Sequence, residues 1–441
     1  MRPQKEYMYN LVIYLYLCGV AVVSLFNKKV KKMWRGERQA VKILKERVDP
    51  NARYIWFHAA SLGEFEQGRP LMEQIRRQHP EYRILLTFFS PSGYEVRKNY
   101  EGADIVCYLP LDTIRNARRF LRAVRPEMAF FIKYEFWYNY LHILKHRGVP
   151  VYSVSSIFRP DQVFFKWYGA QYGRVLKCFT HFFVQNQISK SLLHGIGLDN
   201  VTVSGDTRFD RVLQIKEASK CLPLVEAFLH HHPSPVTQHP TPVTHHPTPN
   251  TQHPSPNTQH PNVFIAGSSW PPDEDIFIRY FNVHKDWKLI IAPHVIDEGH
   301  LSQIISKLNG RTVRYTQATE ESAAAADCLI IDCFGLLSSI YRYGTVAYVG
   351  GGFGVGIHNV LEAGVWNIPV VFGPNNRQFH EAQGLLTAQG GFEIADYPGF
   401  VSLMNRFSSD APFLQQAGNS AGQFVKSRAG ATELILRSVN L

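Results

Sequence analysis

Cysteine is scarce in this sequence, and basic residues outnumber acidic ones. The six cysteines are scattered along 441 residues and none stands in a C-x-x-C pair, so neither a zinc site nor a disulfide framework is predicted. A reducing compartment fits this usage. The chain has 36 acidic and 47 basic residues, which favours acidic partners such as a membrane surface, phosphorylated lipid or nucleotide phosphate. The sequence shows no nucleic-acid-binding module, so nucleic acid is not predicted as a partner.

Charge is also missing from the stretch Tyr7 to Phe26, which is about long enough to span a bilayer, since roughly 20 residues are needed. Five basic residues follow it at once: Lys28, Lys29, Lys31, Lys32 and Arg35. Their position places the body of the protein in the cytoplasm. A signal peptide fits poorly, because no small-x-small cleavage site follows and the basic cluster lies on the wrong side. We therefore predict that residues 1–35 are a membrane anchor with a basic flank, either spanning or interfacial, with a buried helix as the alternative.

Residues 230–261 lack the apolar side chains that a core needs. They repeat a heptapeptide almost without change, HPSPVTQ, HPTPVTH, HPTPNTQ, HPSPNTQ and HP. Proline at every second or third position prevents helix and sheet ladders. The repeated histidines are weak support for metal binding. We predict a disordered linker over residues 216–262.

On both sides of this segment, strand and helix patterns alternate. Short apolar runs of strand length, such as Met128–Ile132 and Val346–Val349, are separated by helical stretches. This alternation predicts two doubly wound, Rossmann-like α/β domains over residues 36–215 and 263–441, with ligands at the carboxyl ends of the strands. The last 20 residues are expected to be helical and to return to the first domain.

The stretch Val346–Pro374 carries the strongest local signal. After its strand come the glycines Gly350, Gly351, Gly352, Gly354 and Gly356, which allow a close approach of the backbone to a ligand. A helix is expected from about His358 to Asn367, with its N-terminus available to an anion. Glu362 on this helix is placed to accept hydrogen bonds from ribose hydroxyls. The alternative is a packing loop in an ordinary α/β domain.

Longer motifs are distributed over the whole chain outside the repeat. In the first half they are HAASLGEFEQGRPL from His58, TFFSPSGYE from Thr87, KYEFWYNYL from Lys133 and SGDTRFDRV from Ser204. In the second half they are IAGSSWPPDE from Ile265, IAPHVIDE from Ile291, IDCFGLL from Ile331 and GGGFGVGIHNVLEAG from Gly350. In order and spacing this set resembles the 3-deoxy-D-manno-octulosonic acid (Kdo) transferases of lipopolysaccharide synthesis, which are GT-B glycosyltransferases.

The resemblance implies a fold, a reaction and a location. It implies two Rossmann-like domains facing a central cleft, and transfer of Kdo from CMP-Kdo to a lipid A precursor at the cytoplasmic face of the inner membrane. The reaction would be an inverting single displacement with Glu64 as general base. The donor site would contain Ser268, Ser269, Pro293, His294, Phe334, Gly335, Leu336, Gly352, Asn359, Val360, Leu361 and Glu362. No Asp-x-Asp motif is expected to face the cleft, so no metal or other cofactor is predicted.

Some positions allow a second interpretation or depart from the family pattern. Glu64 stands three residues after Ser61, where it could instead complete a capping box. Its neighbour Glu66 is expected to point to solvent or to the helix dipole. His294, Leu336 and Val355 replace an arginine, a glutamate and a basic residue that are common in the family.

Outside the expected donor site, Arg159 and Arg208 are candidates to meet an acidic sugar or a phosphorylated acceptor, with surface ion pairs as the alternative. Three other functions remain open. They are a GT-B enzyme that uses another nucleotide sugar, a non-hydrolysing sugar-nucleotide epimerase, and an inactive lipid-binding scaffold.

Overall fold

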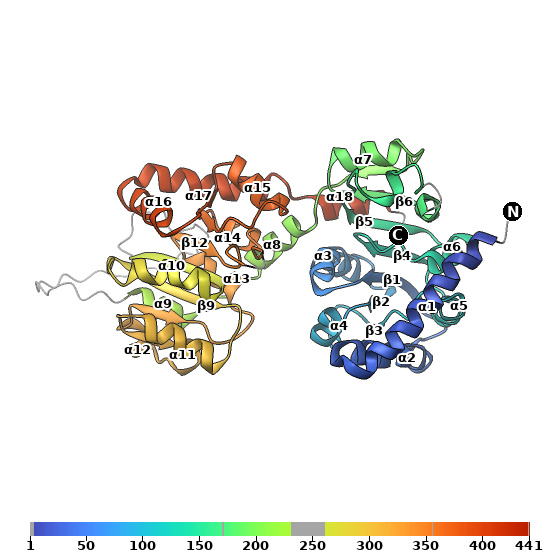
Figure 1. The fold of residues 1–441 in the computed structure, drawn as a ribbon, viewed down its shortest axis with the longest axis horizontal. Helices are drawn as coiled ribbons and strands as arrows, with labels where there is room; N and C mark the ends of the chain where they lie inside the picture. Colours follow the sequence, from blue (N-terminus) through green and yellow to red (C-terminus); the bar gives the residue numbers. More distant parts are fainter. Residues whose placement is uncertain (1–3, 170–171, 231–260, 355, 440) are drawn as a thin grey trace, which may run out of the picture. The chain divides into compact units, whose positions relative to one another are not determined.

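A computed structural model describes residues 4–169, 172–230, 261–354, 356–439 and 441. The chain forms two compact units, of which unit 1 comprises Met1–Arg211 with Arg428–Leu441 and unit 2 comprises Val212–Ser427. Each unit contains one sheet of seven parallel strands (Figure 1). The predicted α/β class with two doubly wound domains is confirmed.

The sheet of unit 1 has the order β3-β2-β1-β4-β5-β6-β7. Its strands are β1 (Arg53–Ala59), β2 (Tyr82–Phe88), β3 (Ile105–Tyr108), β4 (Met128–Ile132), β5 (Val151–Ser156), β6 (His181–Val184) and β7 (Val201–Val203). The central strand β4 is buried along its whole length. This explains its unbroken apolar sequence, because helices cover both faces of a parallel sheet.

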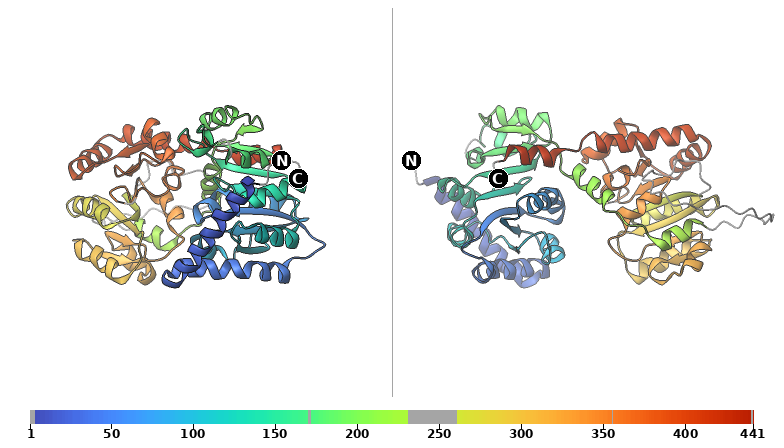
Figure 2. Two further views of the ribbon diagram at one scale, coloured as in Figure 1. Left: turned by 45° about the vertical axis from the view of Figure 1, so that its right-hand side comes forward. Right: turned by 180° about the vertical axis from the view of Figure 1, so that it is seen from behind.

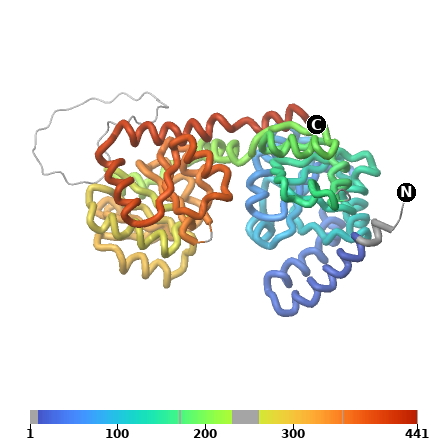
Figure 3. The backbone as a smooth tube through the Cα atoms, turned by 45° about the horizontal axis from the view of Figure 1, so that its top comes forward, coloured from blue at the N-terminus to red at the C-terminus, as the bar shows by residue number. Residues whose placement is uncertain are grey.

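The helices of unit 1 lie in two layers (Figure 1). The helices α2 (Lys28–Arg47), α5 (Ile114–Val124) and α6 (Tyr138–His146) share one core cluster, which also includes residues of α7 (Gln187–His194) and η2 (Tyr172–Cys178). On the other face, α3 (Leu62–Gln78) and the last helix α18 (Ala431–Ser438) share a second cluster. The remaining short elements are α4 (Pro91–Arg97) and η1 (Val163–Phe165). The C-terminal segment thus packs in unit 1 (Figure 3).

The first helix, α1 (Gln4–Phe26), lies along unit 1 (Figure 2). Near its start, the Tyr9 hydroxyl donates a hydrogen bond of 2.7 Å to Asp112. Farther along, Val20 packs with Met33 and Tyr108. The segment Tyr9–Phe26 has a mean hydropathy of 1.9 and is long and apolar enough to cross a membrane.

The sheet of unit 2 has the order β10-β11-β9-β8-β12-β13-β14. Its strands are β8 (Asn262–Ser269), β9 (Trp287–Pro293), β10 (Thr312–Arg314), β11 (Cys328–Ile330), β12 (Val346–Val349), β13 (Val370–Phe372) and β14 (Gly391–Glu393). Its helices are α9 (Pro223–His230), α10 (Pro271–Phe281), α11 (Glu298–Lys307), α12 (Glu320–Ala324), α13 (Leu337–Ile340), α14 (Leu361–Gly364), α15 (His380–Thr387), α16 (Tyr397–Ser409) and α17 (Ala411–Lys426), with η3 (Tyr315–Gln317) and η4 (Tyr341–Tyr343). The helix α8 (Arg208–Glu217) contains the boundary between the units.

Two sequence predictions differ from the structure. The predicted linker included residues 223–230, but these form α9, which packs against α12 in unit 2. The apolar residues Val225 and Phe228 of α9 are fully buried. Their burial offsets the conformational entropy that the chain loses when this helix forms. The heptapeptide repeat itself, and also Val355, lie outside the described residues. The helix expected from His358 to Asn367 is only the single turn α14.

Candidate active site

Glu64 lies where strand β1 passes into helix α3, at the carboxyl edge of the unit 1 sheet. Its Oε2 atom accepts hydrogen bonds from the backbone N–H groups of Ala60, at 2.5 Å, and Ser61, at 3.3 Å. Glu64 therefore does cap the helix, as the alternative interpretation of the sequence held. Both bonds fall on one oxygen, and no hydrogen bond to Oε1 is found among the residues that the structure describes. That oxygen is free to accept a proton from a substrate.

The surroundings of Glu64 favour its protonated form. Burial raises the pKa of Glu64 to about 7, and the negative charge of Glu135 adds to this rise. The hydrogen bond from Ala60 and the positive charge of Lys133 oppose it. A carboxylate with a pKa near neutrality is suited to general base catalysis, because it combines basicity with a sizeable deprotonated fraction.

Glu135 is held by two side chains. Its Oε2 atom lies 3.1 Å from Nε2 of His58 and accepts a bond of 2.6 Å from Nε1 of Trp137. His58 is fully buried, and its other ring nitrogen lies 2.9 Å from the Thr87 hydroxyl. Sequence motifs contain these residues, but they predict no role for Glu135. Only the fold brings β1 and the loop after β4 together.

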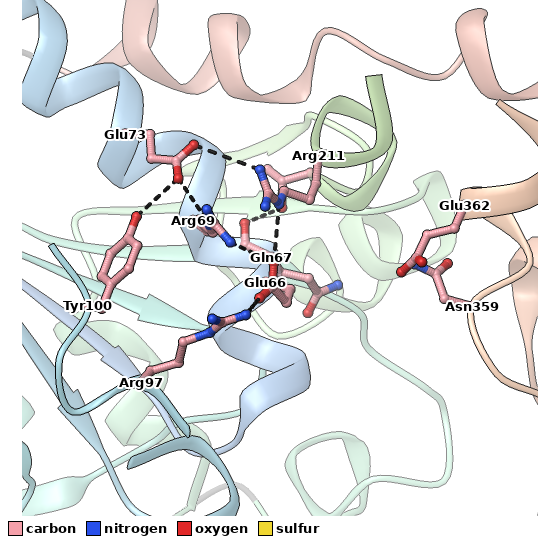
Figure 4. Close-up of polar contacts among 10 residues, drawn as sticks. Glu66, Gln67, Arg69, Glu73, Arg97, Tyr100, Arg211, Asn359 and Glu362 are labelled. Carbon is pink, nitrogen blue, oxygen red and sulfur yellow. Dashed lines mark hydrogen bonds and ion pairs between the residues drawn. The ribbon is translucent and has the colours of Figure 1, made fainter. Parts of the chain in front are cut away.

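Glu66, two residues after Glu64, belongs to an ion-pair network rather than pointing to solvent (Figure 4). It accepts from Arg97 at 2.8 Å and from Arg211 at 3.1 Å. On the same face of α3, Arg69 donates to Glu73 at 2.6 Å. The sequence prediction for Glu66 was wrong because its arginine partners come from α4 and α8. The network makes Glu66 a poor candidate for the base, since both carboxylate oxygens are occupied.

The two arginine candidates differ in their contacts. Arg208 donates through Nε to Asp206 at 2.9 Å, and Asp206 also accepts from Gln67 at 3.0 Å. The charge of Arg208 helps to keep the pKa of the buried Asp206 low although its burial acts in the opposite direction. Arg159 is more exposed and lies 3.9 Å from Asp161. Arg159 is therefore the easier of the two for a ligand to reach.

In unit 2, the expected donor residues lie at the carboxyl ends of β8, β9, β11 and β12. Ser268, the residue before the last of β8, has a left-handed φ of 52°, a conformation that costs a serine of order 1–3 kcal/mol and recurs at functional sites. A Cβ on Gly350 would lie 2.3 Å from the Ser268 carbonyl, and one on Gly352 would lie 2.6 Å from the Gly373 Cα. These glycines are thus required for close packing of loops, as the alternative interpretation of the sequence held.

A buried carboxylate fixes the start of the glycine loop. Asp273 accepts from the backbone N–H groups of Gly351 and Trp270, each at 2.9 Å, and from the Tyr348 hydroxyl at 2.7 Å. Next to it, Ser269 donates to Glu274 at 2.8 Å, and Glu274 lies 2.9 Å from His300. Ser269 is fully buried and its hydroxyl is engaged with Glu274, so its side chain is placed to hold the loop.

Three aromatic side chains form a platform at this edge. The Trp270 Nε1 donates to Nε2 of His358 at 3.2 Å, so the indole and this imidazole meet edge to edge. The ring of His294 stacks on both, at 4.7 Å from Trp270 and 4.3 Å from His358. Because both partners lie on the same side of His294, its other face is directed outward. Burial and the neighbouring His294 lower the pKa of His358 to about 4. His358 is therefore neutral, and its Nε2 can accept the hydrogen bond from the indole N–H.

The remaining donor residues are distributed around this platform. Asn359 donates to Glu362 at 3.0 Å (Figure 4), and its own oxygen accepts from the Leu361 backbone N–H at 3.2 Å. Val360 and Leu361 are fully buried, so only their backbones could contact a ligand.

After strand β11, which pairs with β9, Phe334 is 81% exposed. The next residue, Gly335, adopts a φ of 88°. Leu336 precedes α13, and Pro293 ends β9. In the part of the chain that the structure describes, no group of three or more His, Cys, Asp or Glu side chains is arranged to hold a metal ion.

Comparison with known protein families matches residues 34–211 to the model of the 3-deoxy-D-manno-octulosonic-acid transferases (kdotransferases). The 3-deoxy-D-manno-octulosonic acid transferase of Aquifex aeolicus is 25% identical over 363 residues, covering 80% of this chain and 86% of that protein. The one from Chlamydia muridarum is 24% identical over 365 residues, covering 79% and 77%. These matches confirm the resemblance found in the sequence motifs.

Solved structures are similar in fold. A UDP-GlcNAc 2-epimerase from Neisseria meningitidis has a TM-score of 0.57 at 11% identity, covering 87% of this chain and 99% of that one. MurG of Acinetobacter baumannii has a TM-score of 0.52 at 10% identity, covering 88% and 99%. At such low identity the likeness concerns the fold alone, and it agrees with the GT-B class.

Proposed function

We propose that the chain is a glycosyltransferase of the Kdo transferase family and that it transfers Kdo from CMP-Kdo to a lipid A precursor. The single observation that carries the mechanism is Glu64, a partly buried carboxylate with a pKa raised to about 7 and one oxygen without a partner among the described residues. A sugar hydroxyl is a weak nucleophile, so a carboxylate that takes its proton accelerates the reaction by roughly 10²–10⁴-fold.

In the proposed reaction, Glu64 takes the proton of the acceptor hydroxyl as its oxygen attacks the anomeric carbon of Kdo. The new bond joins that carbon to the acceptor oxygen, while the bond to the phosphate oxygen breaks and CMP leaves with the electron pair. A single displacement inverts the configuration at the anomeric carbon. The residues at the carboxyl edge of the unit 2 sheet are proposed to bind CMP, with the free face of His294 stacking on the base.

The acceptor is proposed to reach unit 1 from the membrane. Several apolar residues of α1 are exposed, among them Leu15, Leu25 and Phe26, and the basic residues at the start of α2 follow directly. Within unit 1, Tyr9 and Val20 hold α1 against the sheet domain through Asp112 and Tyr108. If residues Tyr9–Phe26 crossed the bilayer, the polar surface of unit 1 next to the contacts of Tyr9 and Val20 would lie in the hydrocarbon layer. We therefore favour an interfacial helix at the cytoplasmic face of the inner membrane.

Substitution of Glu64 tests the mechanism. Glu64→Gln keeps an oxygen that can accept the two backbone hydrogen bonds of the cap, but it cannot take a proton. We expect kcat to fall by roughly 10²–10⁴-fold with little change in the melting temperature. Turnover within a few-fold of the wild type would rule out Glu64 as the base.

Nucleotide selectivity tests the donor. Binding to the folded state raises the melting temperature, so CMP is expected to raise it more than UDP at equal concentration. A larger effect of UDP would favour a different nucleotide sugar, or the epimerase that the fold also accommodates.

A further inference from the structure

Unit 1 has a cavity of about 370 Å³ that the proposed reaction does not use. Three arginines and three apolar residues line it: Arg122, Arg125, Pro126, Leu144, Arg147 and Val149. They come from the ends of α5 and α6 and from the loops that lead into β4 and β5. These loops lie at the amino ends of the strands, whereas Glu64 follows the carboxyl end of β1. The cavity is therefore on the edge of the sheet opposite to the catalytic carboxylate.

The three arginines line the cavity without an acidic partner. None of them forms an ion pair with a carboxylate anywhere in the described part of the chain. The acidic residue nearest in sequence, Glu127, is already held by Arg53 through two hydrogen bonds of 2.8 and 2.7 Å. All three arginines are exposed to solvent, which weakens their mutual repulsion without removing it, so a bound anion would be favoured at this site.

Backbone contacts hold two of the arginines in place. Arg147 Nη1 donates to the Leu121 carbonyl at 2.8 Å, at the end of α5. Arg125 ends the same helix with a left-handed φ of 48°, and its backbone N–H also bonds Leu121 at 3.1 Å. Burial, together with the charges of Arg122 and Arg125, lowers the pKa of Arg147. A bound anion would relieve both the repulsion and this shift.

We propose that this cavity binds a phosphoryl group, with the guanidinium groups around its oxygens and Pro126, Leu144 and Val149 against the carbon atoms next to it. Guanidinium groups match phosphate geometry and bind it through paired hydrogen bonds. The phosphoryl group could belong to a lipid headgroup or to a soluble phosphate. The outer face of α5 adds the exposed arginines Arg115, Arg118 and Arg119 beside the cavity. They would attract either ligand but do not line the site.

The test compares two double variants of the full-length chain with equal charge. Arg122→Gln/Arg125→Gln removes two cavity arginines and leaves the bond from Arg147 to Leu121. Arg118→Gln/Arg119→Gln removes the same charge from the outer face of α5. Retained melting temperatures and CMP binding show that each variant is folded. The probes are inorganic phosphate, at constant ionic strength, and vesicles of phosphatidylcholine with or without phosphatidic acid.

We expect the cavity variant to bind one of these probes about tenfold more weakly than the wild type, while the α5 control stays within about twofold. Selective loss of phosphate binding would support a soluble ligand, and selective loss of phosphatidic acid binding would support a headgroup. The proposal is wrong if the wild type binds neither probe, or if both variants lose binding equally, since the latter shows general attraction to a basic surface.

Discussion

At the scale of single residues, Glu64 combines two tasks in one side chain. One oxygen caps helix α3, and the other is directed away from the cap. The cap fixes the carboxylate relative to the end of β1, while burial and Glu135 raise its pKa to about 7. An exposed glutamate, with a pKa near 4.3, would be fully ionised at neutral pH but a much weaker base.

The pH dependence of catalysis follows from this pKa. Because the base must be deprotonated, kcat/KM should rise with pH through an apparent pKa near 7 and then level off. Glu135→Gln removes a negative charge that raises the pKa of Glu64, so the rising limb should move to lower pH. A limb that stays in place, or moves to higher pH, would contradict the assignment. Glu73→Gln, on the outer part of α3, is the control and should leave the limb in place.

The platform under His294 gives a second prediction at this scale. Trp270→Phe keeps an aromatic ring beneath His294 but removes the N–H that bonds His358. We expect CMP to bind roughly 2–12-fold more weakly, which corresponds to the loss of one hydrogen bond of about 0.5–1.5 kcal/mol. Isothermal titration calorimetry measures this directly. Trp167→Phe, at an exposed position of unit 1, should have no effect. Equal losses for both variants, or none for Trp270→Phe, would show that the platform does not support the nucleotide.

The sequence could identify some of these residues and not others. Glu64 and His294 were found through motifs, because their neighbours in the chain carry the signal. Glu135, His58 and Trp270 also lie in these motifs, but they act through contacts between segments far apart in the sequence, so no local pattern indicates their roles. The pairing of Glu66 with Arg97 and Arg211 was missed for the same reason.

At the scale of secondary structure, the strands with unbroken apolar runs were predictable. Strands β4 and β12 have the predicted bounds, since burial on both faces demands apolar residues at every position. The edge strands β10 and β14 have three residues each and were missed. Helix α14 is shorter than predicted because the loop from Gly350 to Asn359 is built by glycine contacts and by side-chain bonds to the backbone.

Helix α1 yields a prediction at this scale. Leu15 and Leu25 are 64% and 73% exposed, and an interfacial helix would insert such residues into the lipid. Leu15→Asp/Leu25→Asp should therefore release the protein from vesicles in a flotation assay. Val283→Asp, at a site of unit 2 that is also 73% exposed, is the control. Continued flotation of the double variant would contradict membrane binding through α1.

At the scale of the whole molecule, the chain passes between the units within α8 and again before α18. The heptapeptide repeat does not join them, because it follows α9 and precedes β8, which both belong to unit 2. The sequence suggested a linker between domains because composition changes abruptly at the repeat. Only the packing of α9 on α12 reveals that the repeat is an insertion within one domain.

Removal of the repeat tests whether it contributes to function. Its composition cannot form a core, so deletion of His232–His260 should leave turnover and CMP binding within about twofold of the wild type. A short Gly/Ser replacement of matched span is the control for the closure of the gap. A large loss with the deletion but not with the replacement would indicate that only the length matters. Loss with both would show that the repeat itself has a role, contrary to this prediction.

The mass of the reaction product is the most direct test of Kdo transfer to a lipid A precursor with Glu64 as the base. Detergent-solubilised wild-type protein and the Glu64→Gln variant would each be incubated with CMP-Kdo and a tetra-acylated lipid A precursor. The wild type is expected to add the mass of one or more Kdo units to the acceptor, and the variant almost none in the same time. An unchanged acceptor mass with wild-type protein that still binds CMP would contradict the proposed transfer to this acceptor.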